Sequence, residues 1–526
     1  MRLLAALFVT LLSCWLPALA QAPARATLHL VLVLDGLRPD SINAQDTPTL
    51  HRLRTEGVTF LNGHAVFPTV TRVNASSIGT GTYPARHGMM GNVVFIPAAD
   101  AKRAFNNDDA AKLLALGERI LTAPSLAELM QQAGEKFVAV SSGSTGSALL
   151  IAPRSPGGIG TVINGHFDGQ VAFPKEAGEA ITKRFGRAPK KGGAKDPYDD
   201  AMVWGMTVLG DYVLPELKPR VVISWLTEPD HIQHGLGAGS PEAIESIRKD
   251  DAQVGLLLKK IAALDLQERT NVIVVSDHGF GHTVHNVNVG EALRAAGLAA
   301  PDSDDVIVAS SGQAIALHVK NHDRARIAAL VEFLQREPWC GVIFTAAGRG
   351  AAHEGSVPGT FALEYVHLGG HERSPDIVFT FPWSSARNRH GVPGTDYNQV
   401  TSGKTEAVTV DTANHGGIGP WTVRNTMLAW GPDFKRGTVV RTPAANVDVA
   451  PTIAHLLGMR QALAGMDGRP LLEALAGGPD EEQVAMETRT LEVSHGTYRA
   501  VLQMSETAGR RYVDKAWRIT APAAAR

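Results

Sequence analysis

The chain has 526 residues, of which 44% are hydrophobic and 19% are charged. This composition is typical of a folded globular protein and excludes a largely disordered chain or a coiled coil. Lysine and arginine total 50 against 52 aspartate and glutamate residues, so the formal net charge is −2. There is therefore no overall positive charge of the kind that holds a nucleic-acid polymer.

The first twenty residues have the organisation of a signal peptide. An arginine precedes the apolar run Leu3–Leu12, and a small-x-small cleavage site ends at Ala20. The run is too short to cross a membrane, so we expect export to the periplasm or beyond, with cleavage near Ala20. A weaker lipoprotein-like pattern ends at Cys14, and lipidation there is the alternative. Cleavage would leave Cys340 as the sole cysteine, without a disulfide partner.

Apolar strand patterns alternate with helical patterns through the first half of the chain. The strand runs are almost continuously apolar, which is typical of strands that are covered on both faces. The expected strands are residues 28–34, 137–141, 220–226 and 271–276. The expected helices are residues 48–56, a stretch that begins after residue 71 and ends near 81, and residues 125–135, 199–217 and 240–266. This alternation predicts an α/β/α sandwich with a mostly parallel central sheet.

Residues 281–404 lack this alternation and are broken by glycine, proline and histidine, which indicates an inserted cap subdomain. Core character returns with a strand at 426–430 and a helix at 447–457. We therefore expect a core formed by residues 21–280 and 405–476, and a C-terminal tail at 477–526 with a strand-like stretch at 494–504. The histidines of the cap are interpreted as surface or structural residues. No apolar run after the signal peptide reaches membrane-spanning length.

Side chains that can bind metal follow three of the predicted strands, and a late glycine-rich loop adds one histidine. The set is Asp35, Asp230, His234, Asp277, His278 and His415. Ligands of open α/β sheets bind at the carboxyl ends of the strands, where these residues would meet. Mixed carboxylate and imidazole ligands suit zinc or a similar cation. An aspartate after a strand can be a plain turn cap, so the coincidence of all six is what favours two metal sites.

A helical pattern begins after Thr71 and ends near Gly81, which places Thr71 at the helix N-terminus. A hydroxyl at a helix N-terminus lies beside free N–H groups and the positive end of the helix dipole, which suits a nucleophile that attacks phosphorus. Local sequence alone favours the simpler interpretation that Thr71 is a helix cap.

The ordered set of motifs resembles the nucleotide pyrophosphatase/phosphodiesterase branch of the alkaline phosphatase superfamily. The matching stretches are Asp35–Asp40, Thr71–Asn92, Asp230–His234, Ser276–Gly279 and Asn414–Gly416. The resemblance covers residues 26–285 and 405–475 and implies an alkaline phosphatase-like fold. It also implies hydrolysis of phosphodiester or pyrophosphate bonds in a small phosphoester substrate, with two divalent metal ions, expected to be Zn²⁺.

The resemblance assigns a role to each residue. Thr71 is the implied nucleophile, which forms a phosphothreonine intermediate. Asp35, Asp277 and His278 are the implied ligands of the metal that activates the Thr71 oxygen. Asp230, His234 and His415 are the implied ligands of the second metal. Asn92, together with the Thr71 backbone N–H, is implied to hold a non-bridging phosphoryl oxygen.

The sequence also departs from the family pattern. Arg72 stands where nucleotide-cleaving relatives usually have an aromatic residue. The Pro-Asn-His sequence that usually follows is replaced here by Val73-Asn74-Ala75, which keeps only the asparagine. Whether this protein prefers nucleotide substrates is therefore left open by the sequence.

Three other functions are compatible with parts of these motifs. Related monoesterases have a Lys-x-Arg pair where Ser141–Gly146 stands here without a cation; Arg154 is close. A phosphodiesterase is therefore favoured, and a phosphomonoesterase is the alternative. The remote alternative is a non-catalytic, metal-stabilised binding protein. A sulfatase is disfavoured because no cysteine lies near Thr71. The oligomeric state is not predicted.

Overall fold

The computed structural model describes residues 26–519 apart from 191, 194, 301–302 and 400–411. The predicted signal peptide, with Cys14 and the cleavage site at Ala20, lies outside the described residues. Within them, no helix is both long and apolar enough to cross a membrane. Cys340 is buried and forms no disulfide in this part of the chain.

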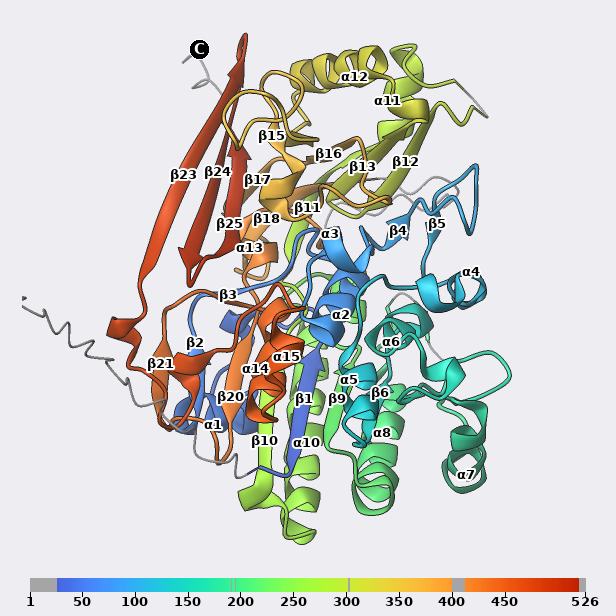
Figure 1. Ribbon diagram of the computed structural model, residues 1–526, viewed down its shortest axis with the longest axis vertical. Helices are drawn as coiled ribbons and strands as arrows, with labels where there is room; N and C mark the ends of the chain where they lie inside the picture. Colours follow the sequence, from blue (N-terminus) through green and yellow to red (C-terminus); the bar gives the residue numbers. More distant parts are fainter. Residues whose placement is uncertain (1–25, 191, 194, 301–302, 400–411, 520–526) are drawn as a thin grey trace, which may run out of the picture.

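A nine-stranded sheet forms the centre of the larger lobe (Figure 1), in the order β21-β2-β20-β10-β1-β9-β6-β7-β8. The middle of the sheet, from β10 to β7, is parallel. The strands are β21 (Thr438–Val440), β2 (Val58–Phe60), β20 (Met427–Trp430), β10 (Thr270–Val275), β1 (Leu28–Leu34), β9 (Val221–Leu226), β6 (Phe137–Ser141), β7 (Thr161–Ile163) and β8 (Ala172–Phe173). The mostly parallel sheet expected from the sequence is confirmed.

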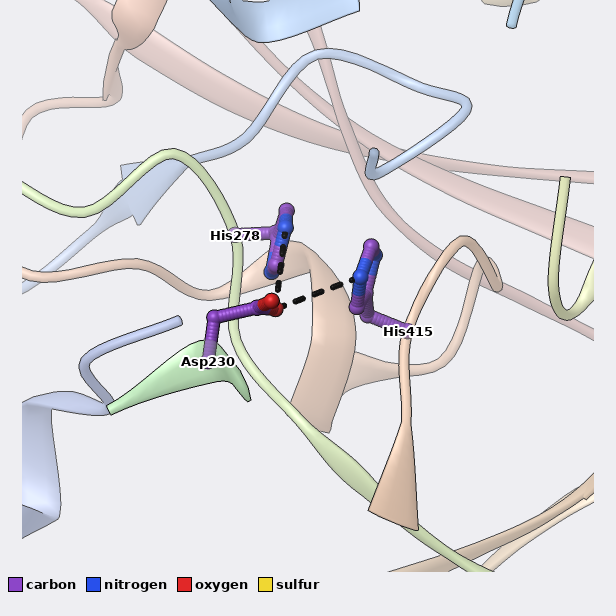
Figure 2. Close-up of side chains that lie close together, drawn as sticks. All are labelled: Asp230, His278 and His415. Atoms are coloured by element: carbon purple, nitrogen blue, oxygen red, sulfur yellow. Dashed lines mark ion pairs between the residues drawn. The ribbon is translucent and has the colours of Figure 1, made fainter. Parts of the chain in front are cut away.

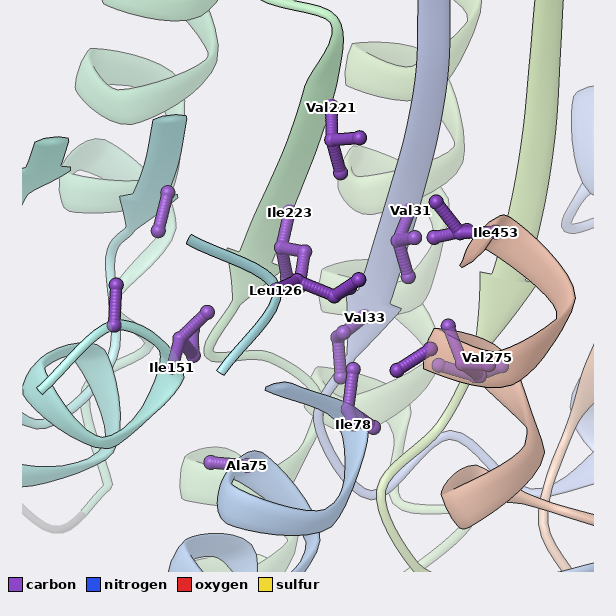
Figure 3. Close-up of a cluster of buried hydrophobic side chains, with 14 of the residues drawn as sticks. Val31, Val33, Ala75, Ile78, Leu126, Ile151, Val221, Ile223, Val275 and Ile453 are labelled. Carbon is purple, nitrogen blue, oxygen red and sulfur yellow. The ribbon is translucent and has the colours of Figure 1, made fainter. Parts of the chain in front are cut away.

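Strand β1 shows why the sheet is covered on both faces. Val31 and Val33 point into one apolar cluster, and Leu30 and Leu32 point into another, because successive side chains of a strand alternate. The first cluster (Figure 3) is closed by α2 (Thr71–Thr80), α5 (Leu126–Gln132), α6 (Thr145–Ile151) and α14 (Val449–Leu456). The second is closed by α1 (Pro48–Glu56), α8 (Asp199–Val208) and α10 (Pro241–Ala263). The α/β/α sandwich is thus confirmed.

The helix expected at 199–217 is divided. Helix α8 ends at Val208, and the chain continues as a π-helical segment, Leu209–Leu217. Pro215 lies inside this segment and has no N–H to donate, so regular α-helical hydrogen bonding cannot run through it. Helix α10 begins as predicted, with the Ser240 hydroxyl accepting the N–H of Ala243 at 3.2 Å.

The segment predicted as a cap has its own sheets and its own core, at the top of Figure 1. A five-stranded sheet contains β12 (Val306–Ser311), β13 (Ala314–Val319), β16 (Ile377–Thr380), β14 (Ile343–Thr345) and β15 (Phe361–Ala362). Two helices, α11 (Val289–Ala295) and α12 (Arg324–Arg336), pack against its core. A four-stranded sheet contains β17 (Trp383–Arg387), β18 (Pro393–Gln399), β11 (Gly281–Val287) and β19 (Ala413–Asn414). Strand β19 ends immediately before His415, so this sheet reaches the site.

The segment expected to be a tail contains an antiparallel sheet of β23 (Met486–His495), β24 (Tyr498–Thr507) and β25 (Arg510–Arg518). The single strand-like stretch expected at 494–504 is divided by a turn at Gly496, whose φ of +57° is readily adopted by glycine. Tyr498 and Leu502 share the apolar core of the cap with Phe344. This C-terminal sheet is therefore packed against the cap.

Candidate active site

The six predicted metal ligands converge at one edge of the central sheet. Asp35 follows β1, Asp277 and His278 follow β10, and Asp230 begins α9 (Asp230–Leu236) after β9. Figure 2 shows Asp230 facing the imidazoles of His278 and His415. Its Oδ1 lies 3.9 Å from Nε2 of His278 and 3.3 Å from Nε2 of His415. The two rings stack with centroids 3.6 Å apart.

His278 is shared between two groups of ligand atoms. Its Nε2 lies 3.0 Å from Asp277 Oδ2 and 3.5 Å from Asp35 Oδ1, which makes the first group. The second compact group is Asp230, His278 and His415. His234, expected in that second group, lies at its margin, with Nε2 3.4 Å from Asp230 Oδ1. The structure therefore brings all six residues together, and His278 lies within reach of both groups.

Each of the three aspartates keeps one buried oxygen without a hydrogen-bond partner among the described residues: Asp35 Oδ1, Asp230 Oδ1 and Asp277 Oδ2. For two of them the other oxygen is occupied. Trp225 Nε1 donates to Asp35 Oδ2 at 2.8 Å, and the Gly36 N–H donates to Asp277 Oδ1 at 3.0 Å. A bare buried carboxylate oxygen is costly unless it meets a cation. The donor set thus fits one or more metal ions.

The three histidines are oriented by main-chain carbonyls. His234 Nδ1 lies 3.1 Å from the carbonyl oxygen of Ala413. His278 Nδ1 lies 3.1 Å from that of Gly279, and His415 Nδ1 lies 3.0 Å from that of Thr69. A carbonyl only accepts, so each Nδ1 carries a proton and each Nε2 presents its lone pair to the aspartates when the ring is neutral. This is the arrangement that metal-binding histidines require.

Burial and mutual repulsion shift the acidity of the cluster. Burial raises the pKa of Asp35 well above its usual value, and the nearby charges of Asp277 and Asp230 raise it further. Burial also disfavours the Asp230 carboxylate, yet the adjacent His234 and His415 hold the pKa of Asp230 well below its usual value. Burial, followed by His278, lowers the pKa of His415 well below its usual value. The cluster thus brings buried carboxylates close enough for their charges to repel one another, and a bound cation would offset this repulsion.

Glycines shape the two loops that carry Asp35 and His415. Gly36 has a φ of +68°, and a Cβ there would lie 2.6 Å from the ring of Phe280. Gly416 has a φ of +106°, and a Cβ there would lie 2.2 Å from the carbonyl oxygen of Ser311. A side chain at either position would displace a neighbouring metal-ligand candidate.

Thr71 is the first residue of α2, and its Oγ1 lies 3.4 Å from Nε2 of His278. Val70 occupies the cap position, and no side chain caps this helix. The interpretation of Thr71 as a plain helix cap is therefore wrong. Asn92 Oδ1 accepts the N–H of Arg72 at 3.0 Å, which fixes the Asn92 amide beside Thr71.

The sequence did not reveal several supporting residues. Asn446 Nδ2 lies 2.9 Å from Asp277 O and 3.0 Å from Asn74 Oδ1, so it ties the Asp277 turn to α2. Asn74 also donates to the carbonyls of Val66 and Val70, which gives the retained motif asparagine a structural role. Asn446 lies in a stretch that resembles the family, whereas Trp225 is indistinguishable from other core residues of an apolar strand.

Arg154, the nearby cation considered for the monoesterase alternative, and two of the cap histidines have structural partners. Arg154 Nη1 lies 3.2 Å from Glu128 Oε1, and Glu128 caps α5, so Arg154 has a structural partner. Among the cap histidines, His367 stacks on Tyr83 with centroids 3.7 Å apart. His371 Nε2 lies 2.9 Å from the Thr122 hydroxyl. Both of these histidines make structural contacts.

Comparison with known proteins agrees with this arrangement. The profile of the type I phosphodiesterase / nucleotide pyrophosphatase family matches residues 29–403. The chain belongs to this family. It is 27% identical over 259 residues to human ectonucleotide pyrophosphatase/phosphodiesterase family member 1, a match that spans 48% of this chain and 23% of that protein. It is 26% identical over 280 residues to human family member 7, which spans 53% of each. The chain thus spans about half or less of these relatives.

The fold has solved counterparts. Murine ectonucleotide pyrophosphatase/phosphodiesterase 5 superposes with a TM-score of 0.56 at 16% identity, over 85% of this chain and 99% of that chain. The human counterpart of that protein gives a TM-score of 0.54 at 18% identity, over 82% of this chain and 94% of that chain. The alkaline phosphatase-like fold expected from the motifs is therefore confirmed.

Proposed function

We propose that this protein is an exported metal-dependent hydrolase of phosphodiester or pyrophosphate bonds that acts through Thr71. The observation that carries the proposal is the position of the Thr71 hydroxyl, 3.4 Å from His278 Nε2, beside three aspartates that each keep a bare oxygen. A hydroxyl, a helix N-terminus and a cation site then lie together, as phosphoryl transfer requires.

Two divalent ions, expected to be Zn²⁺, are assigned to the cluster. Asp35, Asp277 and His278 would hold one beside Thr71, and Asp230, His234 and His415 would hold the other. When bound, such ions favour the deprotonated nucleophile and stabilise the oxygens that enter and leave phosphorus. Metal dependence is typical of this family, and the ligand types suit zinc.

The residues of the chain have these roles in the proposed reaction. The Thr71 oxygen forms a bond to phosphorus while the bond from phosphorus to the leaving-group oxygen breaks. The hydroxyl proton of Thr71 passes to solvent, and the leaving group departs as an alcohol or phosphate that takes up a proton from water as its pKa requires. The product is a phosphothreonine, which water then hydrolyses to regenerate Thr71. The Asn92 amide and the Thr71 backbone N–H donate to a non-bridging phosphoryl oxygen, where negative charge is concentrated.

The cation pair of related monoesterases has no counterpart in Ser141–Gly146, and Arg154 is paired with Glu128, so we favour a diester or pyrophosphate over a monoester. Arg72 is the cation near Thr71 that could meet a further charge on the substrate. An inactive threonine-to-alanine variant of murine ectonucleotide pyrophosphatase/phosphodiesterase 5 was solved in complex with AMP. Nucleotide phosphoesters are therefore among the first substrates to test. We place the mature protein in the periplasm or outside the cell, on the strength of the sequence before Gln21. The non-catalytic alternative is disfavoured because the nucleophile and all six ligands are present.

The test is the hydrolysis of bis-p-nitrophenyl phosphate by the chain from Gln21 onward, purified with zinc. Thr71→Ala should lower turnover at least about 1,000-fold while the bound zinc stays unchanged, because all six side-chain ligands remain. Thr71→Ser, the matched control, keeps a hydroxyl and should retain measurable turnover. Full activity in Thr71→Ala, or loss of zinc together with activity, would contradict the nucleophile assignment.

A further inference from the structure

Arg72 places a cation directly beside the proposed nucleophile. It is the second residue of α2, its N–H is bound to Asn92, and only 12% of its side chain is exposed. Three aspartates act on its guanidinium electrostatically: Asp108 most strongly, then Asp35 and Asp230 of the site. The side chain therefore lies in the electrostatic field of the reaction centre.

No side chain or carbonyl in the described part of the chain accepts a hydrogen bond from the Arg72 guanidinium. Among the described residues, its closest carboxylate oxygen is Asp108 Oδ1 at 3.7 Å, beyond hydrogen-bond distance, and its buried Nε has no partner. That Asp108 oxygen already accepts the Gly146 N–H at 3.2 Å and the Thr145 hydroxyl at 3.3 Å. A buried arginine is costly unless its donors are satisfied.

Two other buried arginines of the described residues, Arg38 and Arg469, have acceptors for their guanidinium donors. Arg38 donates to the carbonyls of Phe280 and Pro393, at 2.7 and 2.9 Å, and pairs with Asp40. Arg469 makes a double contact with Glu473, at 2.6 and 2.9 Å. Arg373 also has a buried Nε without a partner, but its terminal nitrogen Nη1 donates to the carbonyls of Ile120 and Gly88. Arg72 differs from all three, and it differs at the site of reaction. Its missing acceptor is therefore one that arrives with the substrate.

We propose that Arg72 binds an additional anionic phosphate oxygen of the substrate, either on the reacting phosphorus or on the phosphate bonded to it. The inference rests on the proposed function and narrows its substrate class. A simple diester has a single negative charge, which the metal ions and Asn92 already meet. A phosphomonoester or a pyrophosphate brings a further charge, and a guanidinium binds phosphate oxygens with directed, charge-assisted hydrogen bonds.

Three substrates distinguish an oxygen on the reacting phosphorus from an oxygen on the neighbouring phosphate. Bis-p-nitrophenyl phosphate has one charge, p-nitrophenyl phosphate has a second charge on the reacting phosphorus, and diadenosine pyrophosphate has its second charge on the neighbouring phosphate. The ratio of kcat/KM for each of the latter two to that for the diester is measured in wild type, Arg72→Met, Arg72→Lys and Arg154→Met. Arg154→Met is the matched control, because that arginine pairs with Glu128 away from Thr71.

Arg72→Met should lower at least one ratio by about tenfold or more, while Arg72→Lys lowers it less and Arg154→Met leaves it unchanged. A fall confined to the monoester places the oxygen on the reacting phosphorus, and a fall confined to the pyrophosphate places it on the neighbouring one. Ratios that are unchanged in Arg72→Met, including the case in which kcat/KM falls equally for all three substrates, would overturn the role of Arg72. The proposed function would not be affected by that result. A wild-type protein that hydrolyses none of the three would overturn the proposed function and, with it, this inference.

Discussion

Two buried aspartate–histidine sites in this protein are held in opposite ways. Where the C-terminal sheet meets the core, Asp514 Oδ1 lies 2.8 Å from His64 Nε2, and both Asp514 oxygens accept the Ser505 hydroxyl at 3.0 Å. His64 Nδ1 lies 3.1 Å from Ala444 O. In the candidate active site, Asp35 and Asp277 face His278, yet each keeps a buried oxygen with no hydrogen bond.

The difference separates a structural site from a ligand site. Leaving a buried acceptor unsatisfied costs about 1–3 kcal/mol, more for a charged group, so the active-site cluster is unfavourable when empty. The surrounding fold keeps it assembled through Trp225, Gly36 and Asn446, which bind the other oxygen or the backbone of these aspartates. Breaking each site should therefore have different consequences.

Asp277→Asn should have the largest effect. The amide is a far weaker metal ligand than the carboxylate, so we expect loss of zinc and a fall in turnover of at least about 1,000-fold. Metal analysis after dialysis and hydrolysis of bis-p-nitrophenyl phosphate measure both. A variant that kept its full zinc content would show that Asp277 is not a ligand.

Trp225→Phe should have an intermediate effect. It removes the hydrogen bond to Asp35 Oδ2 but leaves every ligand in place, so zinc affinity should fall about 10- to 100-fold. Competition with a chelator measures the affinity. Trp204→Phe is the control, since Trp204 donates to Phe185 O at 3.3 Å on the other side of the sheet. Equal zinc affinities in Trp225→Phe and Trp204→Phe would show that Trp225 does not orient Asp35 for metal binding.

Asp514→Asn should leave zinc content and turnover of the folded protein unchanged. Its expected effect is on stability, a loss of about 1–2 kcal/mol, because the amide can still hydrogen-bond His64 but no longer forms a charge-assisted pair with it. Burial alone would raise the pKa of Asp514, but His64 and Ser505 hold it below its usual value. The stabilisation is therefore complete above the unfolded pKa of about 3.9 and is lost as pH falls through the lower, folded pKa. Urea unfolding of both proteins at neutral and acidic pH measures this difference, and a loss of zinc in Asp514→Asn would break the distinction between the sites.

The sequence was most informative where one physical rule acts locally. The run of β1 is apolar on both faces because helices cover both, and Asp35 follows it because the carboxyl edge of a parallel sheet is where ligands gather. The assembly of Asp35, Asp230, Asp277 and His415 at one place was therefore predictable from the order of strands and motifs.

Other features depend on contacts between distant segments. Strand β23 exposes most of its side chains, so it has no apolar pattern, and the turn at Gly496 became visible only in the fold. The long contact of Arg72 with Asp108, at 3.7 Å, depends on where Asp108 lies, which no local pattern encodes. The position of His278 between both ligand groups likewise depends on how closely two loops pack.

The most direct test of the account is to count the metal bound by the purified mature chain and to follow activity as that metal is removed. We expect two zinc ions per chain in the wild type, loss of phosphodiesterase activity on treatment with a chelator, and recovery when zinc is returned. An active protein that binds no metal, or one whose turnover is unaffected by complete removal of metal, would contradict the assignment of the bare aspartate oxygens as metal ligands.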